Sequence, residues 1–141
     1  MWALFGQRGA QAAITQTFDS NEPGNPQVIF LASYSGTGAT TAFARLRSAI
    51  NACPSDGEDG RTATMRSEDL DKAGFPDDTI RVRITTVEEG SNEPAEIIER
   101  VVARVGRCIV DIAGMGPDPQ PPLADESVLR QIQRLRVAQG S

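Results

Sequence analysis

The sequence predicts an α+β fold, in which an antiparallel, curved β-sheet has two main helices packed on one face, in the order β-β-α-β-β-β-β-α. Two observations predict this class: apolar residues recur at helical spacing in two segments, and the other apolar segments are short, rich in β-branched residues and separated by Gly or Pro. A length of 141 residues with 39% hydrophobic residues suits one domain over residues 1–141. Residues 1–11 are expected to be a flexible or truncated N-terminal segment.

The first two predicted strands are residues 12–18 and 28–32. The first mixes Ala and Ile with β-branched Thr, and the loop at residues 19–26 is rich in Asn, Asp, Gly and Pro. Residues 28–32 (Val-Ile-Phe-Leu-Ala) form a continuous apolar run, which is typical of a strand buried on both faces.

The clearest helix lies between Ser35 and Pro54. Thr40 or Thr41 is expected to cap its first turn, and Pro54 ends it because proline has no amide hydrogen to donate. Its apolar positions fall three or four residues apart and form one stripe: Ala39, Ala42, Phe43, Leu46, Ala49, Ile50 and Cys53. The loop before it follows a strand but lacks the lysine of a phosphate-binding loop, so a plain helix entry is expected.

Four more strands are expected after a loop at residues 55–60. Residues 61–66 form a short strand, and residues 79–87 alternate between apolar and polar side chains. Residues 97–105 and 107–113 form a hairpin that turns at Val105-Gly106.

The remaining elements are an acidic segment and a final helix. Residues 67–96 contain nine acidic and three basic side chains, and Ser67 to Lys72 are expected in a loop or a short helix rather than in the sheet. Asp125 or Ser127 is expected to cap the helix, which turns Val128, Leu129, Ile132 and Leu135 to the core.

Composition excludes several classes of function. The chain has no histidine, which excludes Ser-His-Asp and Cys-His catalysis and histidine-bound zinc or haem. The net charge of −5 argues against a nucleic-acid partner. The sequence therefore predicts a protein that is not an enzyme and that has neither a cofactor nor a metal site.

The candidate site residues are mainly arginines. Arg81 and Arg83 share one strand face and Arg100 and Arg104 another; if these two faces coincide, they form a stripe that can bind a carboxylate or a phosphate. A solvated outer face countered by glutamates is the alternative. Asp111 is taken as the acid embedded in an apolar strand. It is either a weak site candidate or the salt-bridge partner of an arginine in the sheet.

The two cysteines are 55 positions apart, which is not the spacing of a redox or zinc pair. In an exported protein, a disulfide between Cys53 and Cys108 would close a long loop and stabilise the fold by about 4 kcal/mol. We expect that bridge, and two free buried thiols are the alternative.

The segments Ala42 to Pro54 and Val101 to Ile112, followed by a C-terminal helix, resemble the sensor-like domain of actinobacterial lipoproteins. That domain is similar to the extracellular sensor domain of PknH-type receptor kinases. The resemblance implies an extracytoplasmic, non-catalytic domain, secreted or lipid-anchored, with a cleft for an undefined ligand. A cytoplasmic location is the alternative.

The leading hypothesis is a cleft lined by Tyr34, Arg81, Arg83, Arg100, Arg104 and Asp111, in which arginines bind an anion and Tyr34 stacks on the ligand or donates to it. The expected partner is an unknown small molecule or a cell-envelope component, and the expected state is a monomer or a weak homodimer. Membrane association is expected only through an anchor outside this sequence. A small biosynthetic enzyme or binding protein using an Asp/Tyr pair, and a protein-interaction domain without a pocket, are the rival hypotheses.

Overall fold

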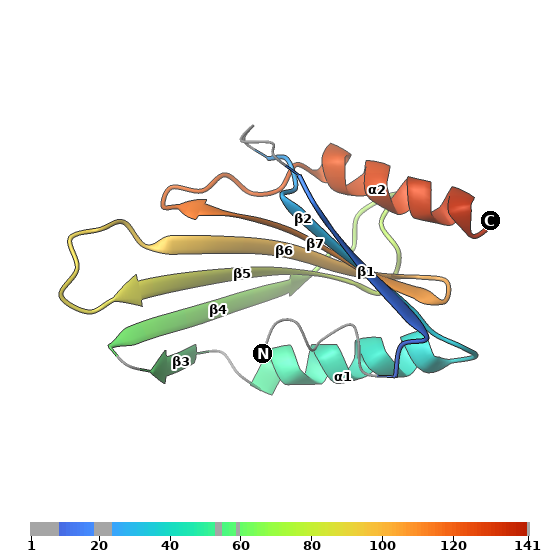
Figure 1. Ribbon diagram of the computed structural model, residues 1–141, viewed down its shortest axis with the longest axis horizontal. Helices are drawn as coiled ribbons and strands as arrows, with labels where there is room; N and C mark the ends of the chain where they lie inside the picture. Colours follow the sequence, from blue (N-terminus) through green and yellow to red (C-terminus); the bar gives the residue numbers. More distant parts are fainter. Residues whose placement is uncertain (1–8, 19–23, 53–54, 59, 141) are drawn as a thin grey trace.

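The computed structural model describes residues 9–18, 24–52, 55–58 and 60–140. In this part of the chain one antiparallel sheet contains seven strands in the order β1-β2-β7-β6-β5-β4-β3 (Figure 1). The strands are β1 (Ala12–Thr17), β2 (Val28–Ser33), β3 (Ser55–Glu58), β4 (Arg61–Asp69), β5 (Thr79–Glu88), β6 (Glu96–Val105) and β7 (Cys108–Pro117). The helices are α1 (Gly38–Ala52) and α2 (Asp125–Ala138).

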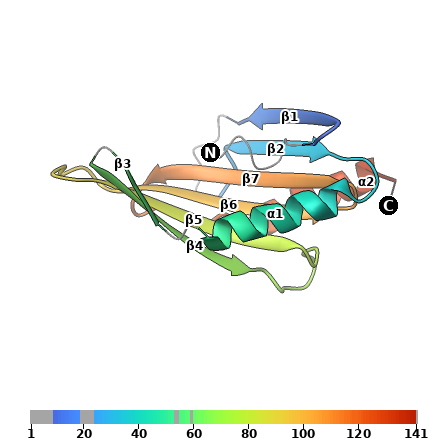
Figure 2. The ribbon, with the colours of Figure 1, turned by 90° about the horizontal axis from the view of Figure 1, so that it is seen from below.

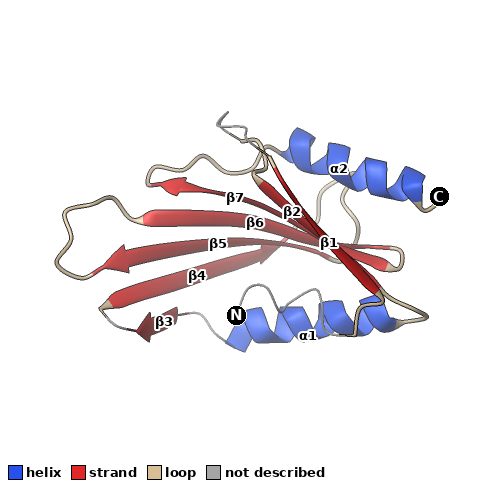
Figure 3. Cartoon of the chain, in the orientation of Figure 1, coloured by secondary structure: helices blue, strands red, loops and turns tan. Residues whose placement is uncertain are grey.

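The predicted α+β class, the antiparallel sheet and the succession of main elements are confirmed (Figure 3). The extent of the strands differs from the prediction most clearly in two places. Residues 55–58, predicted as loop, pair with β4 as the short edge strand β3. β4 continues to Asp69, so Ser67, Glu68 and Asp69 belong to the sheet, because each pairs with a residue of β5.

The prediction that both helices pack on one face is wrong. α1 buries Phe43, Leu46 and Ile50 against one face of the sheet, which also presents Val82 and Val102. We call this the α1 face. On the opposite, α2 face, Val128 and Ile132 of α2 pack with strand residues Val101, Val110 and Ile112. Figure 2 shows α1 in front of the sheet and α2 behind it.

The central strands explain this arrangement. Successive residues of a strand point to opposite faces, and in β6 both Val101 and Val102 are buried, as are both Ile109 and Val110 in β7. Both faces of these strands are apolar and are more stable when another element shields them from water, because burying a large apolar side chain contributes about 1.5–3 kcal/mol. One helix on each face provides both covers.

The predicted helix caps are also corrected. α1 begins at Gly38, so Thr40 and Thr41 lie inside the helix, and the Thr41 N–H donates to the Thr37 carbonyl. α2 is preceded by Ala124, which has no side-chain cap. Asp125 instead pairs with basic side chains, and the Ser127 hydroxyl donates to the Asn25 side chain. The negative charge of Asp125 still stabilises the helix N-terminus.

The predicted hairpin is confirmed, because Val105 pairs with Cys108 and Gly106 has the positive φ of 59° that such a turn requires. Of the predicted flexible N-terminal segment, residues 1–8 lie outside the described residues. Ala10 packs against the core of the α1 face and the Gln11 N–H donates to the Ser33 carbonyl, so these two residues are part of the fold. No helix within the described ranges is long and apolar enough to cross a membrane.

Candidate functional site

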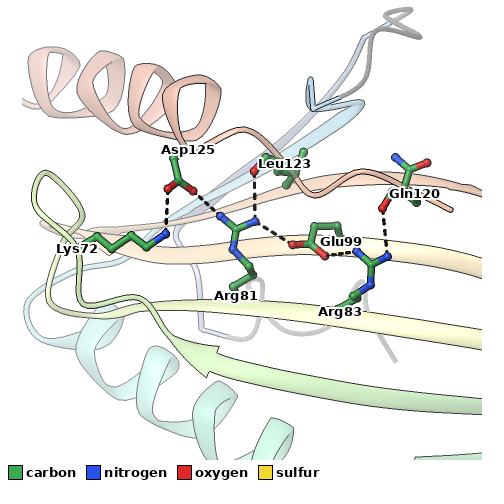
Figure 4. Close-up of polar contacts among 7 residues, drawn as sticks. All are labelled: Lys72, Arg81, Arg83, Glu99, Gln120, Leu123 and Asp125. Carbon is green, nitrogen blue, oxygen red and sulfur yellow. Dashed lines mark hydrogen bonds and ion pairs between the residues drawn. The ribbon is translucent and has the colours of Figure 1, made fainter. Parts of the chain in front are cut away.

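A network of ion pairs lies on the α2 face, beside the first turn of α2. At its centre Glu99 of β6 is only 2% exposed, and its two carboxylate oxygens accept hydrogen bonds from Arg81 at 2.9 Å and Arg83 at 3.2 Å (Figure 4). β5 pairs with β6 so that Arg83 lies directly opposite Glu99. A buried carboxylate between two guanidinium groups is neutralised by its partners.

The same arginines bind the segment that connects β7 to α2. Arg81 donates to the Leu123 carbonyl at 3.2 Å and to Asp125 at 2.7 Å, while Arg83 donates to the Gln120 carbonyl at 3.1 Å. This connecting segment therefore lies along the α2 face and forms one wall above β5 (Figure 4).

Beside this wall, two adjoining hollows share Arg66 and Arg83. One, of about 310 Å³, is lined by Thr64, Arg66, Arg83 and Thr85. The other, of about 410 Å³, is lined by Arg66, Ser67, Glu68, Arg81, Arg83, Glu99 and Pro122. We call the two together the β4–β5 groove.

The strand register determines how the groove is lined. Arg66 of β4 lies directly opposite Arg83 of β5, and Thr64 lies directly opposite Thr85. Side chains opposite each other are about 5 Å apart at Cβ, and like charges there destabilise a sheet. Arg66 makes no ion pair or hydrogen bond with the residues that the structure describes, and these residues leave part of the positive charge without a counter-charge.

The predicted set of site residues is divided between the two faces. Only Arg81 and Arg83 lie at the groove. Arg100 follows Glu99 in β6 and therefore points to the opposite face, the α1 face. There its guanidinium group donates to both carboxylate oxygens of Asp111. The expected salt bridge between Asp111 and a sheet arginine is thus confirmed.

The other two predicted residues are also on the α1 side. Arg104 donates to Asp78 at 2.7 Å, and Tyr34 is 4% exposed within the core under α1. The two arginine pairs do not share a face. Arg83 lies opposite Glu99, whereas Arg100 lies opposite Val82, and residues opposite each other point to the same side of the sheet. The prediction of a single cleft lined by all six residues is wrong.

Of the predicted Cys53–Cys108 disulfide, Cys53 lies outside the described residues, and Cys108 is a free, buried thiol. Cys108 has the same parity in β7 as Val110 and Ile112, so it belongs to the α2 face, whereas α1 covers the other face. Cys108 also pairs with Ser33, close to where α1 begins, and the 15-residue helix runs away from that end of the sheet (Figure 1).

Burial raises the pKa of the Cys108 thiol from 9.0 and that of the Tyr34 hydroxyl from 10.0, although Arg107 partly offsets the shift at Cys108. Above pH 9 the unfolded chain therefore releases protons that the folded chain retains, and we expect the free energy of unfolding to fall as pH rises further. Urea unfolding at a series of alkaline pH values measures this fall. Cys108→Ala should reduce the slope, and an unchanged slope would contradict the assignment.

Sequence reasoning missed Arg66, Glu68 and Glu99 as site residues. Glu99 lies between the apolar pairs Ile97-Ile98 and Val101-Val102, next to Arg100, and carried the same signal as Asp111, an acid within a buried strand. Arg66 and Glu68 could be placed only once β4 was known to extend to Asp69 and its register was known. In the described part of the chain no group of three or more acidic or Cys side chains is arranged to hold a metal ion.

In comparisons with known proteins, no family model, no curated protein and no solved structure matches this chain.

Proposed function

We propose that this domain binds a small anion, a carboxylate or a phosphate, in the β4–β5 groove and does not transform it. The observation that carries the proposal is the pair of arginines, Arg66 and Arg83, which face each other on adjacent strands, and of which Arg66 has no carboxylate partner among the described residues. A bound oxyanion would relieve their repulsion and accept charge-assisted hydrogen bonds from both. The Thr64 and Thr85 hydroxyls in the same hollow are further donors.

The groove supports binding by rigid elements. Arg83 is fixed by Glu99 and by the Gln120 carbonyl, yet its side chain remains 35% exposed, which leaves guanidinium hydrogens free for a ligand. A donor already held in place loses little conformational entropy when the ligand binds.

An extracytoplasmic location and a sensor-like role are part of this proposal. They are supported by the resemblance of the segments around Phe43 and Val110 to the lipoprotein sensor domains, and by no other observation. The genomic coding sequence upstream of Trp2 tests the location: a signal peptide with a lipid-attachment cysteine supports it, and an ordinary cytoplasmic start overturns it.

Arg66→Gln should weaken anion binding by about tenfold or more, because a hydrogen bond to a charged group contributes about 1.5–3 kcal/mol. The measurement is an NMR titration at low ionic strength with acetate and with inorganic phosphate, followed at the amides of Thr64, Arg66 and Thr85. Arg45→Gln is the matched control, since it removes the same charge from an exposed position on α1.

The proposal is wrong if neither anion shifts these amides in the parent protein. It is equally wrong if Arg66→Gln and Arg45→Gln weaken binding to the same extent, because the effect would then come from net charge alone.

A further inference from the structure

The β4–β5 groove holds a carboxylate as well as its arginines. Glu68 lines the larger hollow and is exposed. The register places it directly opposite Arg81, where a cross-strand ion pair is expected. The Arg81 guanidinium is directed to Glu99, Asp125 and the Leu123 carbonyl instead (Figure 4). Across the residues that the structure describes, Glu68 therefore has no ion-pair partner.

We infer that the ligand of this groove is an α-amino acid, with its carboxylate on Arg66 and Arg83 and its ammonium group on Glu68. The inference rests on the proposed function, because it assigns the anion to the same arginine pair. It adds a role for Glu68 that no simple anion would explain.

The spacing supports a compact zwitterion. Arg66 and Glu68 are two positions apart in β4 and share the α2 face, so their Cα atoms are about 7 Å apart. Both side chains stand out from the sheet in the same direction, so a ligand above them needs its opposite charges close together. An α-amino acid carries its ammonium and carboxylate groups on one carbon atom and meets this condition.

The charges of the groove also disfavour a second anionic group. A dicarboxylate or a phosphate dianion would bring extra negative charge close to the carboxylate of Glu68, and like charges repel each other. An ammonium group at the same place is attracted instead. The hollow of about 410 Å³ that Glu68 lines is large enough for an amino acid, and Pro122 gives it an apolar contact for a side chain.

The test is a titration of the folded protein with each of the twenty L-amino acids, followed by NMR at the amides of Arg66 and Glu68. The tightest binder is then compared with its analogue that lacks the amino group. We expect the amino acid to bind about tenfold more tightly than the analogue in the parent protein, as one hydrogen-bonded charge pair implies. In Glu68→Gln the two should bind equally, and Glu93→Gln, which removes an exposed loop carboxylate, should keep the preference.

The outcomes separate the two proposals. If the analogue binds as tightly as the amino acid and Arg66→Gln weakens both, the anion site stands and the amino-acid inference is overturned. If neither compound binds at the highest soluble concentration, the amino-acid inference is overturned, and the titrations with acetate and phosphate decide the anion site separately. If Glu68→Gln keeps the preference for the amino acid, the role of Glu68 is wrong.

Discussion

Glu99→Gln should lower the free energy of unfolding by about 3 kcal/mol, because it removes from a buried ion-pair network the carboxylate that binds Arg83 and one of the two that bind Arg81. Glu99 is 2% exposed, and its carboxylate accepts hydrogen bonds from both Arg81 and Arg83. The amide of glutamine keeps the volume, so the loss measures charge rather than packing. Urea unfolding followed by circular dichroism gives the value.

Glu96→Gln provides the control on the same strand. Glu96 is exposed at the start of β6, and we expect a change within about 0.5 kcal/mol. If the two variants unfold at the same urea concentration, Glu99 does not stabilise the network as its burial indicates. If Glu99→Gln is too unstable to purify, Arg83→Gln is the milder test, since Arg83 is 35% exposed and Arg81 still neutralises Glu99.

Phe43→Ala should lower the free energy of unfolding by about 3–5 kcal/mol, through the lost burial of the ring and the cavity that it leaves. Phe43 is 2% exposed at the centre of the α1 contact with the sheet. The loss is large against the total stability of about 5–15 kcal/mol that is usual for a domain. Because Phe43 lies on the opposite side of the sheet from the groove, the folded fraction should bind anions as the parent does.

Val137→Ala is the matched control, because Val137 is 64% exposed on α2 and its loss should cost less than about 0.5 kcal/mol. Phe43→Leu should fall between the two and keeps the test measurable if the alanine variant does not fold. If Phe43→Ala is as stable as Val137→Ala, the Phe43 ring is not a main contact between α1 and the sheet.

Local patterns predicted most of the secondary structure. The alternation of residues 79–87, the apolar stripe of residues 39–50 and the hairpin at Gly106 each depend on near neighbours, and each is confirmed. The face of the sheet on which each helix packs depends on contacts between residues far apart in the sequence. It could still have been inferred, since Val101 to Ala103 and the pair Ile109 and Val110 are apolar without alternation, which is the pattern of strands covered on both faces.

The candidate site was harder to predict because it depends on strand parity and register. Arg81 and Arg83 were identified correctly as a pair on one face, but whether Arg100 shares that face depends on how β5 aligns with β6. The groove itself depends on β4, whose polar C-terminal half, Ser67 to Asp69, has the composition of a loop. Its pairing with a stable neighbouring strand, rather than its own propensity, makes it a strand.

The neighbouring charges Glu99 and Arg100 point to opposite faces of β6, each to a partner of opposite sign. A slip of β6 by one residue would exchange the two faces. The guanidinium group of Arg100 would then face Arg81 and Arg83, and the carboxylate of Glu99 would face Asp111, with like charges on both sides. The charge pair penalises every alignment in which the two faces of β6 are exchanged, so it favours the alignment found in the folded sheet.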